Sequence, residues 1–319
     1  QEILGTSAAT QRTRKLVQQF ARKDVKVLIT GETGTGKEVV AQGLWQNSER
    51  ASRAFIIVNS AAIPENLIES ELFGHRKRSF TGAINDQIGK IEMADRGTLF
   101  MDEVGDLSPG AQTKLLRFLE TAELQKIGSN QVKKVDVRLI AATSRDLEKE
   151  MAQGRFRQDL YFRLNVGRIE IPPLRERSED VPLLFTYFVR GFCQRFKEEE
   201  KIIEPGAFEL LSRHSWPGNV RELRNVAERA VVLGGRRILA EQLEGLLGGR
   251  PQLPAAPTSE AFLPLKEYKL KMERQYIEAV LRSTQNSVTE AARILGMDRT
   301  YLHQKMAQLG MPTKRNSVG

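Results

Sequence analysis

The sequence predicts an α/β domain with a buried parallel sheet, then a smaller helical domain and a basic helical module at the carboxyl end. Between residues 25 and 171, short β-rich runs alternate with helical patterns, which is typical of α/β domains. From residue 172 to about 248 the strand signals disappear and only helical patterns remain. Residues 249–264 hold four prolines and no sustained period, as linkers do, and residues 265–319 predict three further helices.

The expected strands of the sheet are continuous rather than alternating in apolar residues, which indicates burial on both faces. They occupy residues 26–30, 55–59, 98–103, 137–143 and 168–171. Helical patterns lie between them, so we expect each strand to be followed by a crossover that keeps the sheet parallel.

Composition excludes several classes of protein. The 319 residues are 40% hydrophobic and 28% charged, an ordinary balance that excludes a wholly disordered chain. No apolar run approaches the roughly 20 residues of a membrane span, which excludes an integral membrane protein. The single cysteine, Cys193, excludes a disulfide framework and a cysteine-cluster metal site. Nothing resembles a signal peptide, so we expect a cytoplasmic protein, while a start at Gln1 rather than Met leaves a preceding segment open.

Charge is concentrated at the carboxyl end. The net charge is +9, and residues 265–319 carry ten Lys or Arg against five Asp or Glu, which gives this module +5 and the rest of the chain only +4. A basic module on a near-neutral body indicates nucleic acid as a partner, although a solvated basic face gives the same pattern.

A glycine-rich run follows the first expected strand and precedes a helical pattern. Its residues are Gly31, Glu32, Thr33, Gly34, Thr35, Gly36 and Lys37. In such a phosphate loop the glycines let backbone N–H groups surround phosphates, the lysine neutralises their charge and the helix start adds its dipole. The next residue is Glu38 rather than the Ser or Thr that usually binds magnesium. The run predicts binding of ATP or GTP.

Two adjacent acids end the apolar strand at residues 98–103. We expect Asp102 to hold Mg²⁺ and Glu103 to orient or deprotonate the attacking water. Acids that cap the following helix would give the same pattern, but the phosphate loop in the same chain favours nucleotide hydrolysis.

Taken in order, these motifs resemble the bacterial enhancer-binding proteins of the NtrC family, AAA+ ATPases that activate the sigma-54 form of RNA polymerase. The similar segments are residues 4–7, the phosphate loop with Glu38, ESELFGH at 69–75, GTLFMDEVGDL at 97–107, VDVRLIAAT at 135–143, FRQDLYFRLNV at 156–166, PPLRER at 172–177 and WPGNVREL at 216–223. The resemblance implies an AAA+ α/β ATPase core over residues 1–171, a helical lid over 172–248, a linker over 249–264 and a Fis-type helix-turn-helix domain over 265–319.

The resemblance also implies roles for five further residues. Asn59 resembles the residue that holds the Walker B glutamate, Thr143 takes the sensor I position, and Arg221 resembles the sensor II arginine. Arg157 and Arg163 resemble arginine fingers that reach the nucleotide of the next protomer, which implies dimers that assemble into a hexamer or heptamer ring. A strand-end turn at Asn59 and a pairing of the arginines with nearby acids stay open as simpler explanations. Ser144 follows Thr143 where the family often has Asn.

One surface loop departs from the family. The family carries GAFTGA, a flexible tip that contacts sigma-54, and here the stretch retains Phe80, Thr81 and Gly82 but has Arg78 and Ser79 before them. Losing a glycine narrows backbone freedom at one hinge. We still expect a loop that engages sigma-54, with a basic surface insertion as the alternative.

The carboxy-terminal module follows the pattern of a helix-turn-helix. Ser287 and Glu290 predict a capping box, Gly296 a turn, and Asp298 the cap of a recognition helix that reaches about Leu309. The residues expected to face DNA are Arg299, Thr300, His303, Gln304 and Lys305, with Lys314 and Arg315 as further phosphate contacts. In the preceding helix, Leu270, Tyr276, Ile277 and Val280 predict a dimer seam.

The leading interpretation is an ATP-hydrolysing transcriptional activator with ATP and Mg²⁺ as cofactors. It would bind double-stranded DNA at upstream, enhancer-like sites and remodel the closed complex of sigma-54 RNA polymerase, as the resemblance implies. The alternative is a DNA-binding regulator of other promoters in which nucleotide controls only oligomerisation. The regulated genes, the DNA site, the inducing signal and any receiver domain are not determined by these residues.

Overall fold

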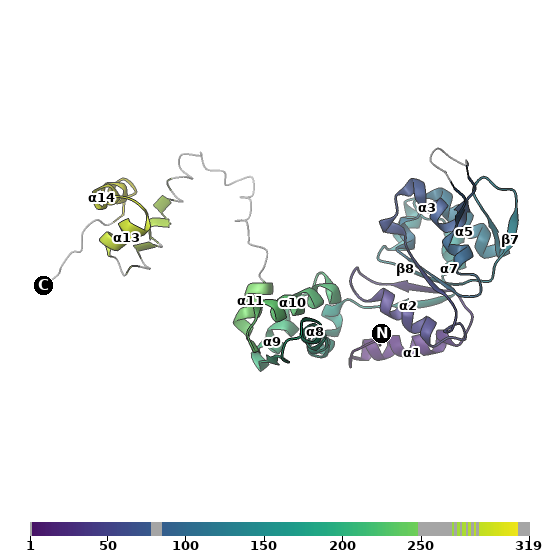
Figure 1. Cartoon of the computed structure of the whole chain (residues 1–319), viewed down its shortest axis with the longest axis horizontal. Coiled ribbons are helices and arrows are strands. Elements are labelled where there is room, and N and C mark those ends of the chain that lie inside the picture. The colour runs from purple at the N-terminus through teal and green to yellow at the C-terminus, as the bar shows by residue number, and fades with distance from the viewer. Residues whose placement is uncertain are drawn as a thin grey trace. The chain divides into compact units, whose positions relative to one another are not determined.

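The computed structural model describes residues 2–77, 85–247 and 287–311, and the single positions or short runs 270, 273–274, 276–278, 280–281 and 284. The chain divides into two compact units, Gln1–Gly249 and Arg250–Gly319 (Figure 1). Several predicted features lie outside the described residues. They are the loop residues Arg78, Ser79, Phe80, Thr81 and Gly82, the linker at 249–264, and Lys314 and Arg315.

The first unit is built on a five-stranded parallel sheet in the order β2-β5-β8-β1-β9. The strands are β1 (Val27–Thr30), β2 (Phe55–Asn59), β5 (Thr98–Asp102), β8 (Arg138–Thr143) and β9 (Gly167–Glu170). The five strands expected from the sequence are confirmed to within a residue at each end. Because all five are parallel, their carboxyl ends meet at one edge of the sheet.

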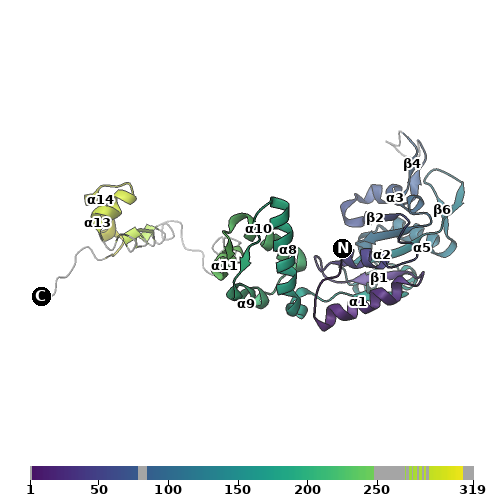
Figure 2. The same cartoon turned by 60° about the horizontal axis from the view of Figure 1, so that its bottom comes forward.

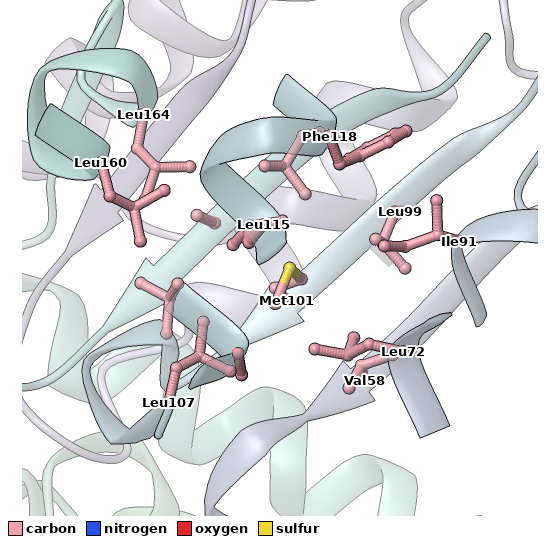
Figure 3. Close-up of a cluster of buried hydrophobic side chains, with 14 of the residues drawn as sticks. Val58, Leu72, Ile91, Leu99, Met101, Leu107, Leu115, Phe118, Leu160 and Leu164 are labelled. Atoms are coloured by element: carbon pink, nitrogen blue, oxygen red, sulfur yellow. The ribbon is translucent and has the colours of Figure 1, made fainter. Parts of the chain in front are cut away.

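Alternate residues of the strands point to opposite faces, and helices cover both. On one face Val58, Leu99 and Met101 pack with Leu72 and Leu115 from helices α3 and α5 (Figure 3). On the other face β1 and β8 pack against helices α1 and α2. The helical segments of the sheet domain are α1 (Ala8–Ala21), α2 (Lys37–Gln46), η1 (Ser60–Ala62), α3 (Glu65–Phe73), α4 (Lys90–Met93), η2 (Val104–Asp106), α5 (Pro109–Thr121), α6 (Leu147–Ala152) and α7 (Gln158–Leu164).

Two short hairpins project from the sheet domain beside each other. One pairs β3 (Gly74–His75) with β4 (Gln87–Ile88) and leads to the undescribed loop, and the other pairs β6 (Glu123–Gln125) with β7 (Val132–Lys134). A bridge between His75 and Ile127 joins them. The second hairpin contains Lys133, which pairs with Glu92 at 3.0 Å, so part of its basic character is neutralised within the chain.

The rest of the first unit is a helical bundle (Figure 2). It has its own buried core, which includes Phe185, Trp216 and Leu223. Its elements are η3 (Leu174–Asp180), α8 (Val181–Phe196), α9 (Pro205–Arg213), α10 (Asn219–Leu233), α11 (Ala240–Leu247), β10 (Ile202–Ile203) and β11 (Arg237–Ile238). The expectation of helices alone is wrong in one detail, because β10 and β11 form a parallel pair. Two-residue strands are too short to give a periodic pattern, which is why the sequence did not indicate them.

The second unit contains α13 (Val288–Ile294) and α14 (Arg299–Gln308). The two helices pack around a common core, and Leu302, Met306 and Leu309 are part of it as expected. Asp298 caps α14 by accepting from the N–H of Thr300 at 2.7 Å. The prediction of a capping box at α13 is wrong, since Ser287 lies at the N-cap but its side chain makes no capping hydrogen bond.

The predicted dimer seam is wrong for half of its residues. Ile277 and Val280 are buried in the core of their own module, whereas Leu270 and Tyr276 are exposed. A helix of this small module must first cover α13 and α14, so its most apolar stripe is used within the chain. In the part of the chain that the structure describes, no helix is long and apolar enough to cross a membrane.

One buried carboxylate joins the bundle to the amino-terminal segment of the sheet domain. Asp180, at the start of α8, is fully buried and accepts from the N–H groups of Thr6 and Ser7 at 2.6 and 2.8 Å. It also accepts from the hydroxyls of Ser7 and Thr10 at 2.7 and 2.6 Å. Burial by itself raises the pKa of Asp180, but the hydrogen bonds from Thr10, Ser7 and Thr6 outweigh it and the pKa is lowered.

We predict that Asp180→Ala lowers the free energy of unfolding by about 3 kcal/mol, because it leaves several buried donors unpaired. Because the pKa of Asp180 is lower in the folded than in the unfolded protein, its ionised carboxylate stabilises the fold. This stabilisation is fully present above the unfolded pKa of about 3.9 and is lost as the pH falls through the folded-state pKa. The difference between wild type and variant in urea unfolding should therefore shrink below about pH 4. An equal difference at pH 7 and pH 3 would contradict the charged role of Asp180.

Candidate functional site: a nucleotide cavity between sheet and lid

The glycine-rich run forms a loop between the end of β1 and the start of α2. The backbone has φ +81° at Gly34 and +103° at Gly36, a region that favours glycine. Gly36 is the N-cap of α2 and supplies no side-chain cap, so the first N–H groups of the helix are available to an anion.

A cavity of about 710 Å³ opens in front of this loop. Its polar end is lined by the phosphate loop and the end of β5, and its apolar end by Ile3, Leu4, Leu184 and Phe188. Of the residues expected at the site, those that line the cavity are Thr33, Gly34, Thr35, Gly36, Lys37, Glu38, Asp102, Glu103 and Arg221. A cavity with an apolar end for a base and a cationic, N–H-rich end for phosphates suits a nucleotide.

Lys37 lines the polar end of the cavity, and its side chain is only 7% exposed. It donates to the carbonyl of Gly31 at 3.0 Å and to that of Glu32 at 3.4 Å, and it pairs with Glu103 Oε1 at 3.3 Å. A nearly buried ammonium has few alternatives to protein oxygens, so an entering phosphate would compete directly with Glu103 for it.

Asp102 ends β5 beside this lysine. Burial and the neighbouring charge of Glu103 raise the pKa of Asp102, while Lys37 and the N–H of Glu103 act in the opposite direction. The charge of Glu38 adds to the rise. Within the described residues, no three acidic, histidine or cysteine side chains lie close enough together to hold a metal ion by themselves, so Asp102 and Glu103 could provide only part of a cation's ligands.

Glu103 has a left-handed backbone, with φ 53° and ψ 50°. Its Oε2 accepts from the N–H of Ser144 at 2.8 Å and from the Ser144 hydroxyl at 2.9 Å. Thr143 is fully buried, and its hydroxyl accepts from the N–H of Arg145 at 3.1 Å. The side chain of Asn59 accepts from the N–H of Ala61 and so caps the turn at the end of its strand. In the structure it is therefore Ser144, and not Asn59, that bonds to Glu103.

The tip of the phosphate loop is bonded to the lid. The carbonyl of Gly34 accepts from the N–H groups of Val220 and Arg221 at 3.0 and 3.3 Å, and that of Thr35 accepts from Arg177 at 2.8 Å. Together with the bond to the carbonyl of Thr33 described below, these bonds hold the carbonyls of three successive residues of the loop. The lid therefore contacts the backbone that would surround the phosphates.

Glu32 points away from the cavity and forms the second half of this contact. It binds both outer nitrogens of Arg175 at 2.9 and 2.6 Å and accepts from Asn219 Nδ2 at 3.1 Å, which lowers the pKa of Glu32 to about 2. Asn219 Nδ2 also donates to the carbonyl of Thr33. Arg175, Arg177 and Asn219 lie in the motifs PPLRER and WPGNVREL, but sequence reasoning gave them no role, because nothing local shows that the lid folds back onto the loop.

The two arginines expected to act on a neighbouring protomer lie away from this cavity, at the two ends of α7. Arg157 pairs with Asp159 of its own chain at 2.7 Å. Arg163 is exposed and lies between Phe162 and Val166, whose side chains are 63% and 60% exposed. An exposed arginine among exposed apolar side chains is typical of a surface that contacts protein.

In the second unit, the residues expected to face DNA lie along α14. Arg299, Thr300 and Gln304 are exposed and His303 is half-buried. Lys305 differs, because its ammonium pairs with Glu273 at 3.0 Å, which raises the pKa of Lys305. Tyr301, which the sequence reasoning did not select, is 52% exposed beside them.

Comparison with known proteins covers most of the chain. Residues 3–170 match the sigma-54 interaction domain, residues 175–255 an AAA+ ATPase lid domain, and residues 270–309 the Fis family of bacterial regulatory proteins. The chain is 46% identical over 307 residues to the transcriptional regulatory protein ZraR of Klebsiella oxytoca, covering 96% of this chain and 68% of ZraR. It is 42% identical over 330 residues to the DNA-binding transcriptional regulator NtrC of Salmonella typhimurium, covering 97% and 70%.

Solved structures give the same result. The crystal structure of NtrX from Brucella abortus has a TM-score of 0.73 at 34% identity and covers 97% of this chain and 69% of NtrX. Another NtrX structure, in complex with ADP, has a TM-score of 0.71. The chain belongs to the NtrC family of sigma-54-dependent activators. It is an AAA+ ATPase and an ATP-dependent transcriptional activator with a DNA-binding helix-turn-helix.

We predict that Gly34→Ala destabilises the nucleotide-free protein by about 1–3 kcal/mol more than Gly36→Ala. Both positions have a positive φ, so both alanines are strained. Only at Gly34 would the new methyl group meet the lid, at 2.5 Å from the carbonyl of Gly218, whereas nothing lies within 4 Å at Gly36. Urea unfolding of the two variants measures the difference, and equal losses would contradict close packing of loop and lid.

Proposed function

We propose that Lys37, Asp102 and Glu103 form the hydrolytic centre and that the loop at Phe80, Thr81 and Gly82 carries its output to sigma-54. The observation that supports this most directly is the ion pair between Lys37 and Glu103 inside the cavity. The γ-phosphate of ATP would take Lys37 from Glu103, and Glu103 would then be free to orient the attacking water. The apolar residues Ile3, Leu4 and Leu184 would enclose the adenine.

The polar end of the cavity also suits magnesium. Asp102 would be the principal ligand, and Glu38 stands where the smaller hydroxyl ligand of other phosphate-loop proteins is found. A bound Mg²⁺ would neutralise charge on the phosphates. The raised pKa of Asp102 supports this assignment, since a partly buried carboxylate next to Glu103 gains from a cation.

Three arginines complete the proposed site. Arg221 already lines the cavity from the lid, so it would contact phosphate within the same protomer. Arg157 and Arg163 would reach the nucleotide of a neighbouring protomer in a hexamer or heptamer ring. Exposed Phe162 and Val166 support a protein contact around Arg163, whereas Arg157 would first have to leave Asp159. Thr143 and Asn59 would sense the nucleotide through the strand ends on which they lie.

The remaining parts would deliver this activity to a promoter. We assign residues 1–171 to the ATPase core, 172–248 to the lid, 249–264 to a linker and 265–319 to DNA binding. Arg299, Thr300, His303 and Gln304 would read base edges at upstream sites on double-stranded DNA, and Lys305 would contact phosphate after release from Glu273. Such a protein would act in the cytoplasm, where the sigma-54 polymerase and the DNA are found.

Replacing Glu103 tests the hydrolytic centre. We predict that Glu103→Ala lowers kcat for ATP at least about 100-fold, because general-base catalysis contributes this much or more. Binding of ATP, measured by isothermal titration calorimetry, should be retained, since Lys37 and the loop N–H groups remain. Normal turnover in this variant would show that another residue activates the water.

Trapping the transition state tests the coupling to sigma-54. With ADP and aluminium fluoride, which mimic the transferring phosphoryl group, the chain should form a complex with sigma-54 that migrates as a discrete band on a native gel. Thr81→Ala should lose the band while keeping ATP hydrolysis. A chain that hydrolyses ATP and binds DNA but gives no band would favour the alternative, in which nucleotide controls only oligomerisation.

A further inference from the structure

We propose that Lys26 acts together with Arg163 on the phosphates of the nucleotide that a neighbouring copy of the chain binds. The inference rests on the proposed function, which brings Arg163 to that nucleotide, and it adds a residue that the sequence pattern did not single out. Lys26 precedes the phosphate loop of its own chain, but it is not among the described residues that line the cavity there. Its place is therefore at a different surface.

The sheet brings Lys26 close to the end of α7. Lys26 directly precedes β1, and its carbonyl accepts from the N–H of Gly167 at the start of β9, at 3.0 Å. Side chains alternate along a strand, so Lys26 lies on the same face of the sheet as Leu28. Leu28 shares a buried core with Leu164 of α7, the helix whose last turn carries Arg163. Two basic residues far apart in the sequence thus meet at one corner of the sheet domain.

The positive charge at this corner is not balanced by the chain itself. Burial lowers the pKa of Lys26, and the nearby charge of Arg163 lowers it further. The acid nearest to Lys26 in the sequence, Asp24, pairs with Arg50 at 2.7 Å. In the part of the chain that the structure describes, no ion pair joins Lys26 or Arg163 to a carboxylate. An anion bound by both would relieve the repulsion between them.

The surroundings of the two cations indicate that the anion comes with another protein surface. Phe162 and Val166 expose large apolar side chains next to Arg163 along the chain, as surfaces that contact protein do. Two cations enclosed by such a contact need a negative group on the partner, because unpaired charges are costly to bury. In the proposed function a second copy of the chain supplies this group, the triphosphate held by its Lys37. A triphosphate has enough negative charge to bind both cations.

Variants of Lys26 in the full chain give the first part of the test. Lys26→Gln should lower kcat for ATP about tenfold, because one positive charge is lost from the developing charge on the phosphates. Lys26→Arg keeps the charge and should stay within about threefold of wild type. Lys23→Gln is the matched control, because it removes the same charge from an exposed side chain nearby in the sequence and should leave kcat unchanged.

Mixing two slow variants tests whether Lys26 acts on the neighbour. Glu103→Ala does not hydrolyse ATP but carries Lys26, so in a mixed assembly it supplies that lysine to the intact Glu103 of a Lys26→Gln protomer. An equimolar mixture should hydrolyse about five times more ATP than the two proteins kept apart, since about half of the intact sites gain such a neighbour. A Lys26→Gln protein mixed with the double variant Lys26→Gln, Glu103→Ala should show no gain.

Each outcome decides the proposal. Normal kcat in Lys26→Gln, or a mixture no more active than its parts, would overturn it. A Lys26→Gln protein that assembles poorly in sedimentation experiments, yet turns over normally once assembled, would also overturn it and indicate an acidic side chain of the neighbour as the partner.

Arg163→Ala, mixed with Glu103→Ala in the same way, separates this inference from the function on which it rests. If neither the Arg163→Ala nor the Lys26→Gln mixture gains activity, the proposed site between protomers fails. A gain with Arg163→Ala but none with Lys26→Gln refutes only the role of Lys26.

Discussion

Hydrogen bonds between the lid and the backbone of the phosphate loop are the constraint on which the rest of the site depends. The carbonyls of Thr33, Gly34 and Thr35 accept from Asn219, from the N–H groups at the start of α10, and from Arg177. A phosphate loop binds through its N–H groups, and here the lid donates hydrogen bonds to the carbonyls of three successive residues at the tip of the loop. The loop and the lid are therefore held together by direct hydrogen bonds.

This arrangement explains how a nucleotide could act on the lid at a distance from its own contacts. Glu32 does not line the cavity, yet its carboxylate joins Arg175 and Asn219 to the loop. Asp180 joins the same lid to Thr6 and Ser7, next to the apolar end of the cavity. Both ends of the cavity are thus connected to one helical bundle. A ligand that spans the cavity would lie next to both sets of hydrogen bonds.

The electrostatics at the strand ends favour a change of partners when phosphate enters. In the described structure Lys37 is nearly buried and balances carboxylates rather than phosphate. Burial and Glu103 raise the pKa of Asp102, which indicates that negative charge there is not fully balanced by the chain itself. In the proposed function, phosphate would remove the lysine from Glu103 and a divalent cation would supply positive charge to Asp102.

The sequence by itself determined the parallel sheet, its strands, the phosphate loop, the acidic strand end and the recognition helix. Each depends on local features, namely apolar runs, glycine spacing and caps, that can be recognised in the sequence alone. The tertiary structure alone decided which side chain holds Glu103, since Asn59 ends β2 and Ser144 follows β8, on the two sides of β5, and it is Ser144 that bonds to Glu103. It also decided that Ile277 and Val280 are buried within their own module and that Arg175, Arg177 and Asn219 bond to the phosphate loop. Such contacts join residues far apart in the chain, and their geometry arises only when the strands, lid and loop have packed.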